Sequence, residues 1–253
     1  MIELVESWAR EAGEIIKQRA SEGFDVSEKT ARDDLVTNVD KEIQAFLFAK
    51  IKETYPDDSI MGEEAEEGEN AKIDMKKGRV WVVDPIDGTI NFVLQNRDYA
   101  VMIATLTNGV PTLGLVYDVV ENELFSGGPG YGVRLNGEQY EPTKKLPLNI
   151  EDGLVGHHAY MFSRDIDQVM TKTKHSLGTR IIGSAGIVLN KMIKGELAAY
   201  ISNLSPWDYL PGSTILHELG YDFAKIDGGE LDFHERAKVI IASPKSIEEF
   251  ING

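Results

Sequence analysis

Hydrophobic residues near the start of the chain recur with the period of an amphipathic helix. Within residues 2–19 they share one helical face, at Ile2, Val5, Trp8, Ala9, Ala12, Ile15 and Ile16. A second helix is predicted after a capping residue at Thr37 or Asn38, and Tyr55 with Pro56 ends it. Its apolar positions also share one face, at Val39, Ile43, Phe46, Leu47 and Ile51. The polar stretch between these helices, residues 21–35, has no periodicity, so we expect a loop or a loose hairpin there.

The middle of the chain carries short β-rich segments separated by turn residues. We expect strands within residues 99–109, 110–120 and 122–128. This punctuation indicates an antiparallel meander, and Asn136 with Gly137 predicts a further hairpin. Upstream, residues 80–83 form an apolar run typical of a strand that is buried on both faces, and Pro85 is expected to end that strand.

The C-terminal part of the chain alternates between strand and helix patterns, as in layered α/β structure. The segment 141–153 contains two prolines and few apolar residues. We expect the boundary there, between an N-terminal half, residues 1–145, and a C-terminal half, residues 146–253. Strands are predicted at residues 154–160, 179–183, 198–202 and 238–243. Helices are predicted at residues 165–177, 184–195, 207–220 and 244–251.

The composition narrows the range of functions. The formal net charge of −16 argues against nucleic acid as the main partner, because such binding depends on Lys and Arg replacing counterions. An anionic substrate would need a bound divalent cation to reverse the local field. The absence of cysteine excludes thiolate metal sites, disulfides and Cys nucleophiles. No apolar run is long enough for a membrane span and no signal peptide is evident, so we expect a cytoplasmic protein without a membrane partner.

Two aspartates follow the buried strand. Asp84 stands at its end, and Asp87 comes directly before Gly88, which permits a tight turn into Thr89. Backbone amides in this turn could open a helix whose N-terminus attracts an anion. Two carboxylates beside such a cradle favour Mg²⁺, which binds carboxylate oxygens and is commonly shared with substrate phosphate. The alternative without a metal is an Asp cap and an Asp turn, each with a backbone hydrogen bond.

Further acidic residues extend this group. Glu63 and Glu64 follow a short apolar strand, and Asp208 stands at a predicted helix start behind Trp207. Each of these clusters alone is typical of capping or solvated acids. Together with the two aspartates after the buried strand, they describe a multi-carboxylate metal site.

Three segments together resemble the inositol monophosphatase family of Mg²⁺-dependent, Li⁺-sensitive phosphatases. They are GEE at residues 62–64, DPIDGTINF at 84–92 and WDYLPG at 207–212, and the order of elements is similar over nearly the whole chain. The resemblance implies an α+β fold, a layered αβαβα sandwich of the sugar-phosphatase type. A large antiparallel sheet would lie in the N-terminal half, and a smaller sheet with helices would complete the substrate site in the C-terminal half. Family members are usually homodimers, so we expect a homodimer.

The resemblance also implies roles for individual residues. Two or three Mg²⁺ ions would be bound by Glu63, Asp84, the carbonyl of Ile86, Asp87 and Asp208. Thr89 would pair with Asp40 to activate a metal-bound water for in-line attack on phosphorus, so that Asp40, Thr89 and Glu63 are the expected catalytic residues. Contacts with a small anionic phosphate ester would come from Asp87, Gly88, Thr89, Gly183, Ser184, Ala185 and Asp208.

Three basic or titratable residues, Lys29, His157 and His158, are not expected to bind metal. Lys29 aligns with a basic residue near the family's active site, although a lone lysine is more often solvated. His157 and His158 are interpreted as strand residues and not as metal ligands.

One departure from the family bears on the substrate. Ile201 stands seven residues before Asp208, where inositol-selective members carry a glutamate. An aliphatic side chain there cannot accept hydrogen bonds from ring hydroxyls, so strict inositol selectivity is not expected. The family resemblance keeps inositol-1-phosphate as the leading candidate substrate. Fructose-1,6-bisphosphatase, NADP(H) phosphatase and 3′-phosphoadenosine 5′-phosphate phosphatase activities stay open, including dual specificity.

Two interpretations outside this chemistry also stay open. Haloacid-dehalogenase phosphatases have a DxDGT motif in which one residue separates the acids and the first acid is a phosphorylated nucleophile on an early strand. Here Pro85 and Ile86 both lie between the aspartates, which disfavours that mechanism. A non-enzymatic regulatory protein that binds a partner through the same fold is the second alternative.

Overall fold

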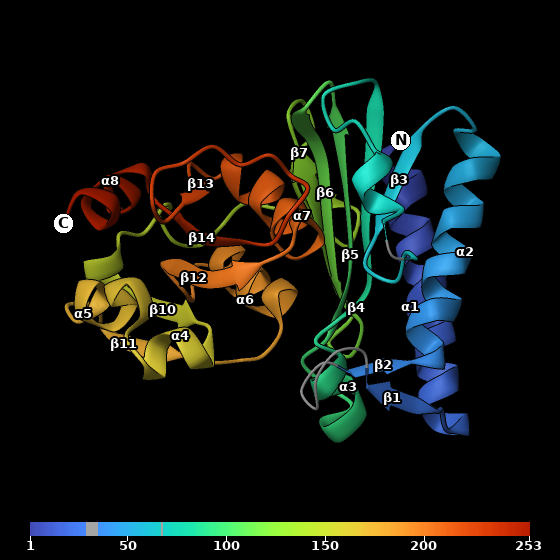
Figure 1. Ribbon diagram of the computed structural model, residues 1–253, viewed down its shortest axis with the longest axis horizontal. Helices are drawn as coiled ribbons and strands as arrows, with labels where there is room; N and C mark the ends of the chain where they lie inside the picture. Colours follow the sequence, from blue (N-terminus) through green and yellow to red (C-terminus); the bar gives the residue numbers. More distant parts are fainter. Residues whose placement is uncertain (29–34, 67) are drawn as a thin grey trace.

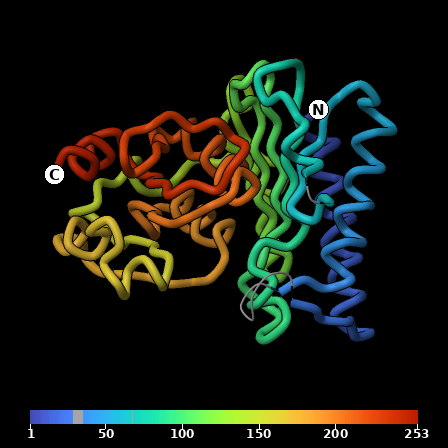
Figure 2. The backbone as a smooth tube through the Cα atoms, viewed as in Figure 1, coloured from blue at the N-terminus to red at the C-terminus, as the bar shows by residue number. Residues whose placement is uncertain are grey.

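The computed structural model describes residues 1–28, 35–66 and 68–253, and Lys29 lies outside them. The described residues form five layers, in the order helices, sheet, helices, sheet, helices (Figures 1 and 2). Buried hydrophobic clusters fill the spaces between successive layers. The α+β fold and the αβαβα sandwich that the resemblance implies are therefore confirmed.

The outer layer beside the large sheet consists of α1, Ile2–Glu22, and α2, Asn38–Thr54. Their apolar faces pack with Trp81 and other sheet residues in one buried cluster, as the periodicity predicts. Thr37 caps α2, since its hydroxyl accepts a hydrogen bond of 3.1 Å from the amide of Val39. Two short antiparallel strands connect the helices, which confirms the hairpin among the two alternatives for this stretch. They are β1, Val26–Glu28, and β2, Leu35–Thr37.

The large sheet has the strand order β3-β4-β5-β6-β7-β8-β9. Strand β3 pairs parallel with β4, and every other neighbouring pair is antiparallel, so the meander and the hairpin at Asn136 and Gly137 are confirmed. The strands are β3 Ser59–Gly62, β4 Arg79–Asp87, β5 Ala100–Thr107, β6 Val110–Asp118, β7 Glu123–Gly128, β8 Gly132–Leu135 and β9 Glu138–Gln139.

Strand β4 continues past Pro85, and the prediction that this proline ends the strand is wrong. The pairing of β4 with β5 is irregular between Asp84 and Asp87, so Pro85 and Ile86 have no regular partners on β5. A proline is tolerated at such a bulge because no ladder hydrogen bond needs its missing amide. The bulge turns the end of β4 before the chain enters α3, Thr89–Gln95.

The smaller sheet has the strand order β11-β10-β12-β14-β13. Strand β10 pairs parallel with β11 and β12, whereas β14 pairs antiparallel with β12 and β13. The last of these strands, β13, is absent from the sequence-based assignment, because its residues show neither alternation nor an apolar run. The strands are β10 Leu154–His157, β11 Gly178–Arg180, β12 Ala199–Leu204, β13 Asp222–Lys225 and β14 Ala237–Ala242.

Two predictions in the C-terminal half are corrected. Strand β10 ends at His157, where its pairing with β12 ends, and His158 precedes helix α4, so His158 is not a strand residue. The helix predicted over residues 165–177 is mostly interrupted, because Asp165 and Asp167 have φ angles of 48° and 53°, which no α-helix allows. Only a 3₁₀ turn, Ile166–Gln168, and helix α5, Val169–Thr173, remain there.

Helices α6, α7 and α8 confirm their predictions, whereas α4 forms where the end of a strand was predicted. Helices α6 and α7 lie between the two sheets, and α4, α5 and α8 cover the far face of the smaller one (Figure 1). Their bounds are α4 Ala159–Ser163, α6 Ala185–Ile193, α7 Pro206–His217 and α8 Pro244–Asn252. Short 3₁₀ turns occupy Asn70–Lys72 and Ile150–Asp152. None of the helices within the described ranges has the length and apolar character that a bilayer span requires.

Helix α7 approaches the large sheet very closely at Gly114 on β6. A Cβ atom at this glycine would lie 2.0 Å from the carbonyl oxygen of Pro211, inside α7. The surrounding core contains residues of both predicted halves, such as Val82, Ala104 and Leu210. The two halves therefore share this hydrophobic cluster between the sheets.

Candidate active site

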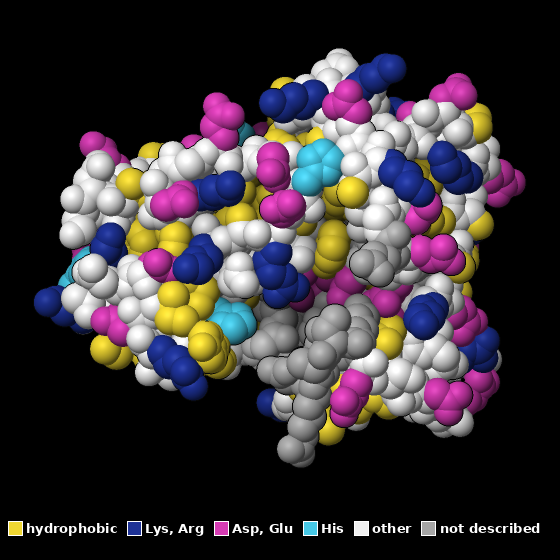
Figure 3. All heavy atoms as spheres, viewed as in Figure 1, with side chains coloured by type: hydrophobic (Ala, Val, Ile, Leu, Met, Phe, Trp, Pro, Cys, Tyr) yellow, Lys and Arg dark blue, Asp and Glu magenta, His cyan; other side chains and the backbone are white. Residues whose placement is uncertain are grey.

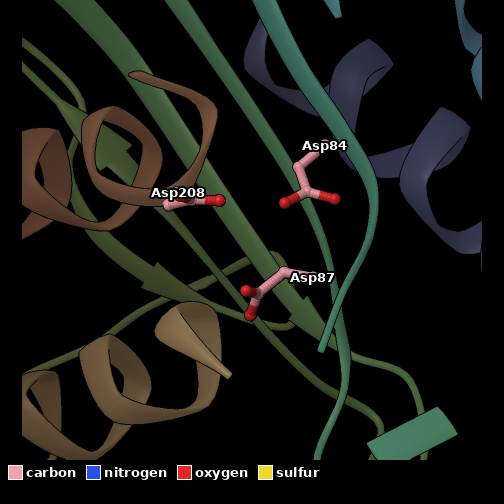
Figure 4. Close-up of side chains that lie close together, drawn as sticks. All are labelled: Asp84, Asp87 and Asp208. Atoms are coloured by element: carbon pink, nitrogen blue, oxygen red, sulfur yellow. The ribbon is translucent and has the colours of Figure 1, made fainter. Parts of the chain in front are cut away.

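Three buried or half-buried aspartates meet where the large sheet faces α7. Asp84 and Asp87 come from the end of β4, and Asp208 comes from the first turn of α7 (Figure 4). One carboxylate oxygen of each lies within 4.8 Å of the others. The fully buried run Val80–Val83 holds β4 in the core, and the amide of Ser205 donates a hydrogen bond of 2.7 Å to Asp208. Sequence segments more than a hundred residues apart thus form the predicted carboxylate group.

The electrostatics of this group suit a divalent cation. Burial raises the pKa of Asp84 well above its ordinary value, and the charges of Glu63 and Asp87 raise it further. Burial also raises the pKa of Asp208 to about 8, with the charge of Asp87 as the next cause. Like charges at this distance strongly oppose joint ionisation. A cation would offset the repulsion, and a set of carboxylate oxygens is the donor chemistry that Mg²⁺ prefers.

Glu63 stands beside the three aspartates but is not one of the group within 4.8 Å. Its amide donates a hydrogen bond of 3.2 Å to the carbonyl of Val83, one residue before Asp84. This contact places Glu63 next to the end of β4 that carries Asp84. By contrast, the amide of Glu64 donates to Gln44 of α2 at 2.8 Å, which ties this part of the acidic pair to the outer helices.

Thr89 and Asp40 form the pair that the resemblance implies. The Thr89 hydroxyl lies 3.1 Å from a carboxylate oxygen of Asp40 and also 3.1 Å from the carbonyl of Ile86, so it can donate to either acceptor. Burial raises the pKa of Asp40, while hydrogen bonds from the hydroxyl and the amide of Thr37 oppose this rise. The amide contact measures 2.8 Å. Asp40 therefore completes the capping box of α2 with Thr37 through one oxygen and contacts Thr89 with the other.

Gly88 forms the turn between β4 and α3. Its φ angle of 88° is left-handed, and a Cβ atom there would lie 2.9 Å from the Cβ of Ser184. Both the conformation and the close approach require glycine. Gly88 and Thr89 start α3 next to the carboxylates but do not line the adjoining cleft.

The turn Gly183–Ala185 is expected to contact the substrate, and in the structure residues of this turn also bind the carboxylate of Asp87. The carboxylate of Asp87 accepts hydrogen bonds from the Ser184 hydroxyl, from the Ala185 amide at 3.0 Å and from the Gly186 amide at 2.7 Å. Burial raises the pKa of Asp87 to about 6, and these bonds limit the rise. The donors at the start of α6 therefore hold Asp87, while the residues of the turn also line the cleft.

A cleft of about 390 Å³ adjoins the carboxylates. Of the predicted site residues it is lined by Asp87, Gly183, Ser184, Ala185 and Asp208. Acidic side chains are visible near the boundary between the two sheets on this face of the molecule (Figure 3). Further wall residues were not predicted from the sequence, among them Ile90, Tyr160, Tyr200, Ser202 and Arg236. His157 and His158 also line the cleft, in addition to their places in β10 and before α4.

Ile201 does not face the cleft, and the interpretation that it replaces a substrate-binding glutamate is wrong. Its side chain is fully buried in the cluster under α4, α5 and α8. Its neighbours Tyr200 and Ser202 point to the other face of β12 and line the cleft. The alternation along β12 places the apolar Ala199 and Ile201 on one face. This pattern was the sequence signal that Tyr200 and Ser202 face the cleft.

Comparisons with known proteins agree with this geometry. The profile described as the inositol monophosphatase family matches residues 1–253. The inositol-1-monophosphatase of Bacillus subtilis (strain 168) is 38% identical over 260 residues, which cover 99% of this chain and 96% of the relative. A crystal structure of an IMPase/NADP phosphatase complexed with NADP and Ca²⁺ matches at a TM-score of 0.85 and 30% identity, covering 99% of this chain and 93% of the other.

A crystal structure of IMPase/NADP phosphatase complexed with Mg²⁺ and phosphate matches at the same TM-score of 0.85 and 29% identity. It covers 99% of this chain and 93% of that one. Fold, carboxylate group and family profile all point the same way, and the chain belongs to the inositol monophosphatase family.

Proposed function

We propose that this chain is a Mg²⁺-dependent phosphomonoester hydrolase that acts on inositol-1-phosphate or a related small phosphate ester. The observation that carries the proposal is the meeting of Asp84, Asp87 and Asp208 beside the Thr89–Asp40 pair. A phosphate placed against the carboxylate group would direct its ester group into the adjoining cleft, which Asp87 and Asp208 line. Family membership supports this activity.

The metal ligands would be Glu63, Asp84, the carbonyl of Ile86, Asp87 and Asp208, for two or three Mg²⁺ ions. Bound Mg²⁺ supplies positive charge to the phosphoryl oxygens and lowers the pKa of water at the site. The protein contributes ligands that are already oriented. The amide of Ile86 donates to Asp84 at 3.1 Å, the start of α6 holds Asp87, and the amide of Ser205 holds Asp208. Such secondary hydrogen bonds keep ligand oxygens in place.

Thr89 and Asp40 would position the attacking water. When the Thr89 hydroxyl donates to Asp40, its oxygen can accept a hydrogen bond from the water, which orients the water toward phosphorus. The Asp40 carboxylate, held by Thr37, can then receive the hydroxyl proton as Thr89 takes one from the water. The amides of Gly88 and Thr89 would donate to the phosphate. Direct attack by water requires no covalent phosphoenzyme.

The test is phosphate release from inositol-1-phosphate, fructose-1,6-bisphosphate, NADP⁺ and 3′-phosphoadenosine 5′-phosphate. We expect Mg²⁺-dependent release from at least one of them, loss of release in EDTA, and inhibition by Li⁺. Absence of release from all four with Mg²⁺ would contradict the proposal. A beryllofluoride adduct on Asp84 would instead support the haloacid-dehalogenase mechanism. We also propose a cytoplasmic homodimer, and light scattering should then give twice the chain mass of 28.1 kDa.

A further inference from the structure

Arg236 is a cationic residue of the cleft that the proposed chemistry does not use. Its side chain lines the cleft together with Asp87 and Asp208, and the residue is exposed to solvent. Among the described residues it makes no hydrogen bond or ion pair, and no other Lys or Arg lines this cleft.

The strand register explains why Arg236 lies near the metal ligands. Ala237 pairs with Leu204 on the neighbouring strand β12. Arg236 therefore lies level with Ser205, which precedes α7 and binds Asp208 through its amide. Burial raises the pKa of Asp208, and the charge of Arg236 opposes that rise. The guanidinium therefore lies close to the proposed site of phosphate hydrolysis, and none of the described carboxylates forms an ion pair with it.

The chemistry of the guanidinium indicates what would bind there. Its planar fork matches the oxygens of a phosphate in a bidentate arrangement, and such charge-assisted bonds are stronger than bonds to neutral hydroxyls. The phosphate that is hydrolysed lies at the carboxylate end, so a second anion must belong to the leaving group. An inositol leaving group carries no charge, whereas the leaving group of a bisphosphate or of a phosphorylated nucleotide does.

We propose that Arg236 is a specificity residue that binds a second phosphate on the leaving group, so that the preferred substrates are phosphate esters with two separate phosphate groups. This inference rests on the proposed phosphatase function. A sugar bisphosphate and a nucleotide with an additional phosphate supply the same chemistry at this position. A second phosphate would form a charge-assisted contact with Arg236, which is stronger than the bonds that a neutral polyol can accept.

The test compares kcat/KM in four enzymes and four substrates at saturating Mg²⁺. The enzymes are the wild type, Arg236→Ala, Arg236→Lys and the matched control Lys238→Ala. Lys238 lies two residues further on β14, is exposed and pairs with Asp167 at 2.7 Å, and it does not line the cleft. The substrates are inositol-1-phosphate, fructose-1,6-bisphosphate, NADP⁺ and 3′-phosphoadenosine 5′-phosphate.

For Arg236→Ala we expect kcat/KM for a doubly phosphorylated substrate to fall at least about tenfold more than kcat/KM for inositol-1-phosphate. Arg236→Lys should fall between the alanine variant and the wild type, since lysine keeps the charge but loses the fork. Lys238→Ala should leave the substrate ratios of the wild type. A selective drop with fructose-1,6-bisphosphate alone identifies a sugar bisphosphate as the source of the second phosphate, and a drop with the other two identifies a nucleotide.

Two kinds of result would overturn the inference while leaving the proposed function intact. One is an equal loss on all four substrates in Arg236→Ala, which would assign Arg236 to the metal site or to folding. The other is a wild type that hydrolyses inositol-1-phosphate and none of the doubly phosphorylated substrates. A wild type that is inactive on all four overturns both the function and the inference.

Discussion

The carboxylate of Asp87 accepts a hydrogen bond of 2.7 Å from the backbone amide of Gly186, which lies 99 residues further along the chain. Together with the bonds from Ser184 and Ala185, it joins the end of β4 to the start of α6. A proposed metal ligand therefore also connects the two predicted halves of the chain. Changes at the start of α6 should alter metal binding even though no residue of α6 is a proposed ligand.

For Ser184→Ala we expect weaker Mg²⁺ binding and a less stable protein. The variant loses the hydroxyl bond to Asp87 and the bond that Ser184 accepts from the Ile187 amide, at 3.2 Å. Loss of a hydrogen bond to a charged group costs about 1.5–3 kcal/mol. The Mg²⁺ concentration for half-maximal activity should rise, and urea denaturation measures the stability change.

Ser243→Ala is the matched control for that experiment. Ser243 caps α8 in the same way, accepting the Ser246 amide at 3.2 Å, and it lies outside the carboxylate group. It should lower the free energy of unfolding without changing the Mg²⁺ requirement. An unchanged Mg²⁺ requirement in Ser184→Ala would show that the bond to Asp87 has no part in metal binding.

For Asp84→Asn we expect an inactive protein that is more stable than the wild type in EDTA. Burial, Glu63 and Asp87 raise the pKa of Asp84, so its negative charge destabilises the metal-free fold, and this destabilisation grows as the pH rises above the unfolded value. Removing the charge should raise the melting temperature by a few degrees in EDTA at neutral pH. Activity should fall at least about a hundredfold.

Added Mg²⁺ should reverse the order of stability. At about 100 times the dissociation constant a ligand stabilises the native state by about 2.7 kcal/mol, and only the wild type keeps the full ligand set. Asp118→Asn serves as control, since Asp118 is buried but bonded to the amides of Val120 and Glu121. Calorimetry with EDTA and with Mg²⁺ measures both effects. A lower melting temperature of Asp84→Asn in EDTA would be incompatible with the repulsion described above.

Two substitutions of Thr89 distinguish the role of its hydroxyl from the role of its side-chain shape. Thr89→Val removes the group that contacts Asp40 and should reduce kcat by about 10²–10⁴-fold, whereas Thr89→Ser should keep most of it. Thr105→Val makes the same replacement at a buried threonine of β5, which contacts Thr112 at 2.9 Å outside the site. Steady-state kinetics at saturating Mg²⁺ decides the matter. Comparable kcat values for Thr89→Val and Thr89→Ser would remove Thr89 from the mechanism.

His157 should make the protein sensitive to mild acid. Burial lowers the pKa of His157 to about 4, while the unfolded chain has the ordinary value near 6.5. Below about pH 6.5 the unfolded state therefore binds more protons than the folded state. The free energy of unfolding then falls as the pH decreases from about 6.5 toward 4. Between pH 7 and 5 this contribution amounts to about 2 kcal/mol.

The measurement is urea denaturation at pH 7 and pH 5 for the wild type and His157→Gln. Glutamine removes the titration and can still contact Thr173, which lies 3.2 Å from the Nε2 atom of His157. The variant should lose less stability than the wild type on acidification. His175→Gln, at an exposed position, should behave as the wild type. Equal losses in the wild type and His157→Gln would assign the acid sensitivity to other groups.

The sequence predicts the longer helices and the carboxylates because their signals are local. The apolar stripe from Ile2 to Ile16 shows one face of a helix without any knowledge of its partner. The acids at Asp84 and Asp208 lie next to strong breaks or caps, so their places at element ends follow from neighbouring residues alone. The family resemblance rests on these same short segments.

The wall of the cleft depends on contacts that local patterns do not reveal. The face of β12 that Ile201 occupies is decided by its pairing with β14 and by the helices on the far side. Arg236 reaches the cleft only because the register places it level with Ser205. The left-handed backbone at Asp165 and Asp167 similarly interrupts a stretch with helical composition.

The close contact of Gly114 with Pro211 limits how this protein can be recombined with its relatives. A chimera that took residues 146–253 from another member would bring a foreign α7 against the native β6. A foreign α7 that does not fit closely against Gly114 would have to shift. Such a shift would displace Asp208, which lies one turn before Pro211. Helix α7 and strand β6 must therefore be exchanged together, although the chain boundary between the halves runs between them.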